Sequence, residues 1–380
     1  YLMVKLFIKK ILLIGTIVIV SFNFGFGQGS GAASIVGNFV TINPDIRSSG
    51  MGNANIASTS HPNDIFNNSS KLQSLDKKVN LALNYTPWFY EITSSYGDLY
   101  LAALGASYKI NENSSVYTAL RYFTYGKFNN TDEQGNTLAT FVPYEVAFDV
   151  GYLRRLSSKL SIGAAFRLIN SQLFVGQFNG QTYTAGQAYA LNFNFTYNQR
   201  PDQSGLSAGF VLNNIGSKLS YTGQNASFIP ANLGIGVGYN FQLDPDNQLN
   251  LALDLNKLLV PAAPVLNITD TSAQAFNNYR TAIQNYNNQD PFSALANSFS
   301  GSNFGNSIKA NFGLEYNYNK IFYARAGYTI QPIEGNFYTF GLGVKAVNIN
   351  LNVSYWLTAG NTTFRNPLNN TIQFGLNYSF

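Results

Sequence analysis

The sequence predicts an all-β fold, a transmembrane outer-membrane β-barrel of about 14 antiparallel strands with an N-terminal plug, or hatch, segment. Three observations support this prediction. From residue 79 onward, apolar and polar residues alternate in segments of about ten residues, the length of a tilted strand that crosses a bilayer. The connections between these segments alternate between short and long. Only 11% of the 380 residues are charged, whereas a soluble domain carries roughly 25%.

The first element is a cleaved secretory signal peptide over residues 1–27. Three lysines precede an apolar run at residues 11–22, and Gly25 and Gly27 supply the small residues that a signal peptidase requires. The run is too short for a transmembrane helix, which needs about 20 apolar residues. We therefore expect the chain to be exported and then shortened.

Residues 28–78 do not alternate and are rich in turn-forming residues, so we expect a compact, irregular plug inside the barrel. Glycine adopts positive φ without steric cost, and two glycines close together indicate a tight turn. The plug motif consists of Asp45, Arg47, Gly50 and Gly52.

Residues 79–380 form the predicted barrel. Tyrosines recur at the ends of the apolar sets and aliphatic residues in the middle, which is typical of aromatic girdles around an apolar belt. The final strand places Ile372, Phe374, Leu376, Tyr378 and Phe380 on one face. This end resembles the C-terminal strand that assembly machinery reads in bacterial outer-membrane barrels. Tyr378 and Phe380 are the candidate assembly signal.

The connections argue against a soluble alternative. An edge strand of a soluble β-sandwich would show the same alternation, but a sandwich has no reason to place short turns on one side and long loops on the other. Outer-membrane barrels show this asymmetry, because their periplasmic turns are short and their extracellular loops are long. The largest extracellular insertion covers residues 258–306. Within it, Phe276, Tyr279, Ile283 and Tyr286 share one helical face.

Charged residues fall on the predicted lumen face of the strands. Opposite charges on neighbouring strands can pair across the ladder. They could form a polar path for a solute or a salt-bridged wall that packs against the plug, and the wall is the favoured interpretation. The first set is Arg121, Glu145, Asp149 and Arg167, and the second is Asp254, Lys309, Glu315 and Arg325.

The long loops carry apolar residues where a simple porin would carry polar ones. Exposed apolar patches mark protein partners or lipid-like ligands. The alternative is that the loops pack on one another over the mouth of the barrel, and the sequence leaves both interpretations open. The candidate partner-binding residues are Trp88, Phe89, Phe141, Phe174, Phe178, Phe228, Phe276 and Tyr279.

Neither catalysis nor a cofactor is indicated by the sequence. The absence of cysteine excludes disulfides and thiolate chemistry, and the only histidine, His61, stands in a Ser-His-Pro turn without a partner motif. No metal-ligand cluster or phosphate loop is present. The net charge of +5 is spread thinly, so nucleic acid is not an expected partner. We expect a protein that is not an enzyme.

Four stretches together resemble the PorV family, a branch of the FadL-like barrels with an N-terminal hatch. One position departs from the pattern, because Asn68-Ser69-Ser70 stands where hatch sequences usually show Asn-Pro-Ala. The four stretches are residues 42–54, residues 84–88 (Asn-Tyr-Thr-Pro-Trp), residues 120–126 and residues 161–167.

The resemblance implies an outer-membrane component of the type IX secretion system of Bacteroidota. Such a protein binds the C-terminal signal domains of cargo at an SprA-type translocon and passes the cargo to a PorU-type sortase, surrounded by outer-membrane lipid. The main alternative is a FadL-like transporter of hydrophobic small molecules, which predicts a continuous apolar pocket from the loops into the lumen. A diffusion porin conflicts with the plug and with the apolar loops.

Overall fold

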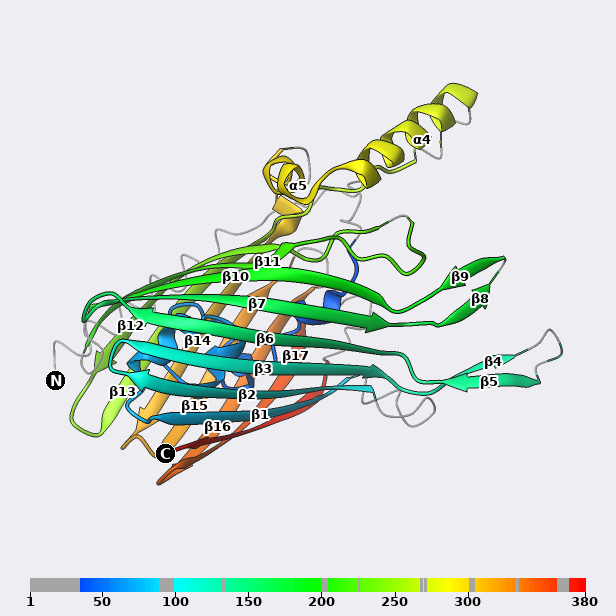
Figure 1. Cartoon of the computed structure of the whole chain (residues 1–380). Coiled ribbons are helices and arrows are strands. Elements are labelled where there is room, and N and C mark those ends of the chain that lie inside the picture. Colours follow the sequence, from blue (N-terminus) through cyan, green and yellow to red (C-terminus); the bar gives the residue numbers. More distant parts are fainter. Residues whose placement is uncertain are drawn as a thin grey trace. The chain divides into compact units, whose positions relative to one another are not determined.

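Fourteen antiparallel strands close into a single barrel (Figure 1), which confirms the predicted 14-stranded β-barrel. The predicted signal peptide lies outside the residues that the structure describes. The computed structural model describes residues 35–88, 99–131, 134, 136–178, 180–199, 204–224, 226–266, 269, 272–300, 305–331, 335–360 and 369–380.

The strands are 9 to 13 residues long, as tilted membrane-crossing strands require. Each strand pairs with its neighbours in the barrel, and β1 pairs with β18 to close it. The barrel strands are β1 (Val79–Pro87), β2 (Leu99–Asn111), β3 (Ser114–Tyr125), β6 (Tyr144–Arg155), β7 (Leu160–Gln172), β10 (Gly186–Asn198), β11 (Gly205–Gly216), β12 (Asn232–Gln242), β13 (Asn247–Leu258), β14 (Ile308–Tyr318), β15 (Phe322–Ile330), β16 (Asn336–Ala346), β17 (Ile349–Ala359) and β18 (Thr371–Ser379).

The alternating pattern sorts side chains between the outside and the lumen. On β18 the predicted outward set, from Ile372 to Phe380, is exposed, while Gln373 and Asn377 are buried in the lumen. A row of tyrosines crosses four neighbouring strands near the long loops, with ring centroids 5.4 to 6.1 Å apart. The row consists of Tyr85, Tyr100, Tyr122 and Tyr144. It forms part of the aromatic girdle that the sequence predicts.

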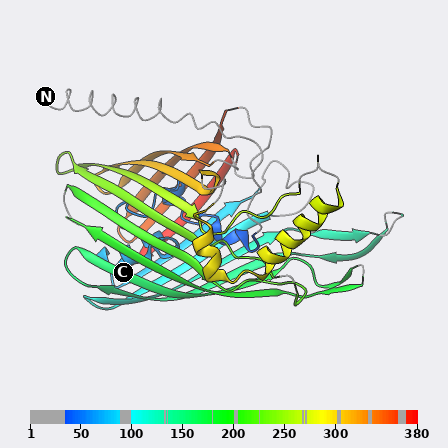
Figure 2. The same ribbon diagram turned by 90° about the horizontal axis from the view of Figure 1, so that it is seen from above.

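Short turns and long connections lie at opposite ends of the barrel, as predicted (Figures 1 and 2). One connection at the long end is an exception, because β15 and β16 are separated only by residues 331–335. Two hairpins extend the strands at this end, and two helices form in the large insertion. The hairpins are β4 (Phe128–Thr131) with β5 (Thr137–Phe141) and β8 (Gly176–Phe178) with β9 (Gln181–Tyr183); the helices are α4 (Ala273–Asn288) and α5 (Pro291–Asn297), followed by η4 (Gly305–Ser307).

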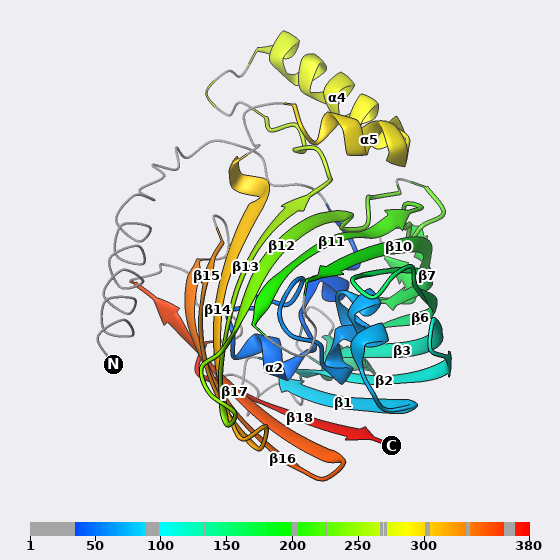
Figure 3. The ribbon, with the colours of Figure 1, turned by 90° about the vertical axis from the view of Figure 1, so that its left-hand side faces the viewer.

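Residues 35–78, here called the inner segment, lie within the ring of strands (Figure 3). Their short elements contact the inner faces of strands on both sides of the barrel. These elements are η1 (Asn38–Thr41), α2 (Ile46–Ser49), η2 (Pro62–Phe66) and η3 (Ser69–Ser74). Among the helices that the structure describes, none combines the length and apolarity that a membrane-spanning helix requires.

Candidate functional site

The glycines of the predicted plug motif lie where the backbone of the inner segment closely approaches the barrel wall. Gly52 has φ +62°, and a Cβ atom there would stand 2.6 Å from the Phe312 carbonyl oxygen. A Cβ on Gly50 would stand 2.8 Å from the Cα of Gly341. Only glycine fits this close approach of two backbones. The motif therefore seats the inner segment against β14 and β16.

Arg47, from the same motif, is tied to the wall by a buried carboxylate. Its Nε and Nη2 donate to the two carboxylate oxygens of Glu315, at 2.9 and 2.7 Å. Arg325 donates to the same Glu315 at 2.6 Å. The Arg47 Nη1 also donates to the Thr59 carbonyl oxygen at 2.7 Å. One buried carboxylate thus holds a guanidinium from the inner segment and one from the wall.

Other lumen side chains bind the backbone of the inner segment. The Asp254 carboxylate accepts hydrogen bonds from the backbone N–H groups of Asn55 and Ile56, at 2.6 and 2.8 Å. The Arg121 guanidinium donates to the carbonyl oxygens of Val40, at 2.6 Å, and Phe66. An irregular segment buried in a lumen needs partners for its backbone groups, and these wall side chains supply them.

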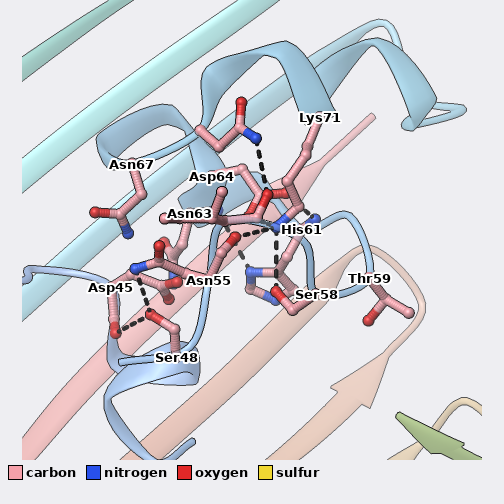
Figure 4. Close-up of polar contacts among 12 residues, drawn as sticks. Asp45, Ser48, Asn55, Ser58, Thr59, His61, Asn63, Asp64, Asn67 and Lys71 are labelled. Atoms are coloured by element: carbon pink, nitrogen blue, oxygen red, sulfur yellow. Dashed lines mark hydrogen bonds and ion pairs between the residues drawn. The ribbon is translucent and has the colours of Figure 1, made fainter. Parts of the chain in front are cut away.

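Polar contacts also hold the inner segment together internally (Figure 4). Lys71 donates to the Asp64 carboxylate at 2.6 Å, to the Asn55 carbonyl oxygen at 2.8 Å and to the Ser58 hydroxyl at 3.1 Å. Burial raises the pKa of Asp64 to about 6, against the opposing charge of Lys71. The buried ion pair and its hydrogen bonds therefore join three turns of the segment.

The only histidine caps the 3-10 helix η2. The backbone N–H of His61 donates to the Asp64 carboxylate at 2.7 Å, and its Nδ1 accepts from the backbone N–H of Asn63 at 3.4 Å. Burial, reinforced by the charge of Arg47, lowers the pKa of His61 well below its usual value. The imidazole is therefore neutral at pH 7, as an accepting Nδ1 requires.

The first predicted set of lumen charges faces inward. Asp149 and Arg167 stand opposite each other on β6 and β7 and form a two-fold ion pair with both distances at 2.6 Å. Glu145 accepts from the hydroxyls of Tyr125 and Ser171, both at 2.6 Å. These charges bind one another, wall hydroxyls or the inner segment, which favours the wall interpretation over a solute path.

Two of the predicted partner-binding residues pack within the loops, which is the alternative that the sequence left open for them. Phe228 is 4% exposed; its ring lies 5.4 Å from that of Tyr286, and the Lys218 Nζ stands 4.1 Å from its centroid. Trp88 is half-buried and meets the Phe123 ring edge-on at 5.5 Å. The loops fold back over the inner segment and cover these rings.

Two further candidate partner-binding residues connect the β4–β5 hairpin with the segment that leads into the β8–β9 hairpin. Phe141 and Phe174 are half-buried, and their rings contact each other edge-on at 5.7 Å. Phe141 also stacks on Phe128 within its own hairpin, and Phe174 contacts Tyr183 in the other. Phe89 and the side chain of Phe178 lie outside what the structure describes.

The large insertion keeps an exposed apolar surface. Phe276 is 46% exposed and Tyr279 is half-buried on α4. The structure adds Phe292 on α5, 74% exposed, and Phe299, 50% exposed. Sequence reasoning missed both, although an isolated phenylalanine in a polar loop was the available signal. We call Phe276, Phe292 and Phe299 the insertion surface.

Local contacts fix the helices that carry this surface. Ser272 caps α4 by accepting from the Ala275 N–H, and Asp290 caps α5 by accepting from the N–H groups of Phe292 and Ser293. Lys218 donates to the Asn287 carbonyl oxygen at 2.7 Å, near the end of α4. Such caps satisfy the free N–H groups of the first turn. The insertion surface is therefore presented on capped helices.

The solved structures that resemble this chain include two toluene transporters and a FadL homologue. The Pseudomonas putida toluene transporter TodX is 13% identical with a TM-score of 0.49, covering 93% of this chain and 98% of its own. The Ralstonia pickettii toluene transporter TbuX is 13% identical with a TM-score of 0.46, covering 88% and 96%. A Pseudomonas aeruginosa FadL homologue is 10% identical with a TM-score of 0.44, covering 93% and 100%.

The comparison of protein families gives the assignment. None of the curated proteins matches the sequence. The family described as type IX secretion system protein PorV matches residues 30–265, more than half of the 380-residue chain. The chain therefore belongs to the PorV family and is an outer-membrane component of the type IX secretion system.

Proposed function

We propose that this protein binds the C-terminal signal domains of secreted cargo at an SprA-type translocon and carries them to a PorU-type attachment complex. The observation that carries the proposal is the insertion surface, in which Phe276, Phe292 and Phe299 are exposed at the long-loop end. That end is extracellular in outer-membrane barrels. Exposed aromatic side chains are typical anchors for a protein partner.

The inner segment supports a role in carrying rather than in permeation. It fills the lumen through polar and charged contacts such as Arg47–Glu315 and Asp254–Ile56. A transporter of hydrophobic molecules needs an apolar route instead, and these contacts do not supply one. In the proposed role the barrel stays closed, outer-membrane lipid surrounds its apolar belt, and the protein performs no catalysis.

Replacing Phe276 and Phe292 with serine should weaken binding of a purified cargo C-terminal domain by about tenfold or more, because truncating a hot-spot residue costs about 2 kcal/mol or more. Both side chains are exposed, so the barrel should still fold. Binding would be measured by surface plasmon resonance with the detergent-purified barrel, and folding by heat modifiability in electrophoresis.

The matched control is Phe128→Ser, because Phe128 is also a solvent-exposed loop phenylalanine, 45% exposed, but lies on the β4–β5 hairpin. The control should bind cargo like the natural protein. Unchanged binding by the Phe276/Phe292 variant would show that the insertion surface is not the cargo site. Equal losses in both proteins would show that the effect is not specific to the insertion surface and would also contradict the proposal.

A further inference from the structure

A polar cavity of about 340 Å³ lies at the end of the barrel opposite the insertion surface. Figure 3 looks into this end. The inner segment forms its floor through Arg47, Thr59 and His61, and the turns that carry Lys320 and Asn348 form its rim. Short turns face the periplasm in outer-membrane barrels. The cavity is therefore a periplasmic vestibule closed on its inner side by the inner segment.

The vestibule is positively charged. Lys77, Lys320 and Lys345 contribute to its lining and are exposed. Within the described ranges, none of the three is in an ion pair. Of the two acidic lining residues, Glu315 is already shared by two guanidiniums, which leaves Asp76 alone against three lysines. A ligand that complements these charges must be anionic.

The wall of the vestibule offers buried amide atoms without protein partners. Asn250 is 3% exposed, and neither its Nδ2 nor its Oδ1 has a hydrogen-bond partner in the described part of the chain. The Oδ1 of Asn317 also lacks a partner in the described residues, while its Nδ2 donates to the Gln248 side-chain oxygen at 3.0 Å. An amide that presents one donor side and one acceptor side matches a peptide group, which offers one N–H and one C=O.

A saccharide would fit this lining less well. Sugars use an open aromatic face as a platform, and Tyr323 is the only tyrosine, tryptophan or phenylalanine in the lining. The Arg325 guanidinium already stands 5.3 Å from the centre of that ring, and the Tyr323 hydroxyl donates to the Lys320 carbonyl oxygen at 3.1 Å. The lining also has few apolar side chains, so bulky apolar residues would find no pocket there.

We propose that this vestibule binds an extended acidic peptide segment of a periplasmic protein. The Asn250 amide and the Asn317 Oδ1 would bind the peptide backbone, and Lys320 and Lys345 would bind its carboxylates. The cavity volume of about 340 Å³ restricts the bound part to a few residues. This site is independent of the cargo surface, because the two lie at opposite ends of the barrel.

The test uses the full-length barrel in detergent and a fluorescein-labelled hexapeptide of alternating aspartate and serine. Fluorescence anisotropy should show saturable binding. A peptide with asparagine in place of aspartate should bind much more weakly. Lys320→Gln combined with Lys345→Gln should lower the affinity by roughly tenfold at low salt, because two exposed charge pairs are lost, and added salt should reduce the difference.

The control removes the same two charges at the same end but outside the cavity lining. Lys78 and Lys159 are both exposed and do not line the vestibule, so Lys78→Gln with Lys159→Gln should leave the affinity unchanged. Equal losses in both variants, or no saturable binding of the acidic peptide, would overturn the proposal. Preferential binding of an acidic disaccharide over the peptide would also overturn it. None of these results depends on cargo binding.

Discussion

Replacing Glu315 with glutamine is expected to loosen the inner segment from the barrel. The stability of the folded protein should fall by about 3–5 kcal/mol, because removing one partner of a buried ion pair leaves a buried charge uncompensated. This loss of stability is large because the Glu315 carboxylate forms ion pairs with both Arg47 and Arg325. Both arginines are buried and would keep their charge. Hydrogen exchange in residues 45–59 should accelerate, and ion conductance across a planar bilayer should rise.

Asp149→Asn is the matched control for this experiment. It also removes one carboxylate from a buried aspartate–arginine pair, but the pair lies within the wall, and neither partner hydrogen-bonds the inner segment where the structure describes it. This variant should lose stability in heat-modifiability assays without faster exchange in residues 45–59. If the two variants open the barrel equally, the carboxylate at Glu315 is not what holds the inner segment.

Replacing Phe380 with serine is expected to lower the amount of folded barrel in the outer membrane several-fold. Its backbone closes the barrel by exchanging hydrogen bonds with Val79, at 2.9 and 3.0 Å, and serine can keep these bonds. The substitution removes only the exposed terminal ring, which lies 5.3 Å from that of Tyr378. If the assembly machinery reads this aromatic end, fewer chains will insert. Quantitative blotting of heat-modifiable protein in outer-membrane fractions would measure the loss.

The comparison variant is Phe374→Ser on the same face of the same strand. Phe374 is 51% exposed and Phe380 is 52% exposed, so both substitutions remove a similar outward-facing ring. Phe374→Ser should reduce barrel levels only slightly. Similar losses at both positions would mean that the lipid-facing area matters and that Phe380 carries no separate assembly signal.

The pattern within each strand was enough to predict the barrel. Side-chain direction in a strand alternates with every residue, so inward and outward faces could be predicted from neighbouring residues alone. That is why the exposed set on β18 and the inward positions of Asp149 and Arg167 could be predicted from local sequence. The helix α4 was also expected, because its apolar residues repeat at helical spacing.

The loops could not be predicted in the same way. The hairpins β4–β5 and β8–β9 extend beyond the predicted strands, where no buried face imposes an alternation. Phe228 and Phe292 are both single phenylalanines in polar loops, yet one is 4% and the other 74% exposed. Their difference depends on which loop folds over which, and this information is not local.

The sequence by itself determined the fold class, the strands and the direction in which each strand side chain points, because these depend on a period of two residues. Only the tertiary structure decided how the inner segment is held and which aromatic residues remain exposed. Arg47 and Glu315 are 268 residues apart in the chain, and the closure of the barrel brings them together. No pattern within a single strand records that contact.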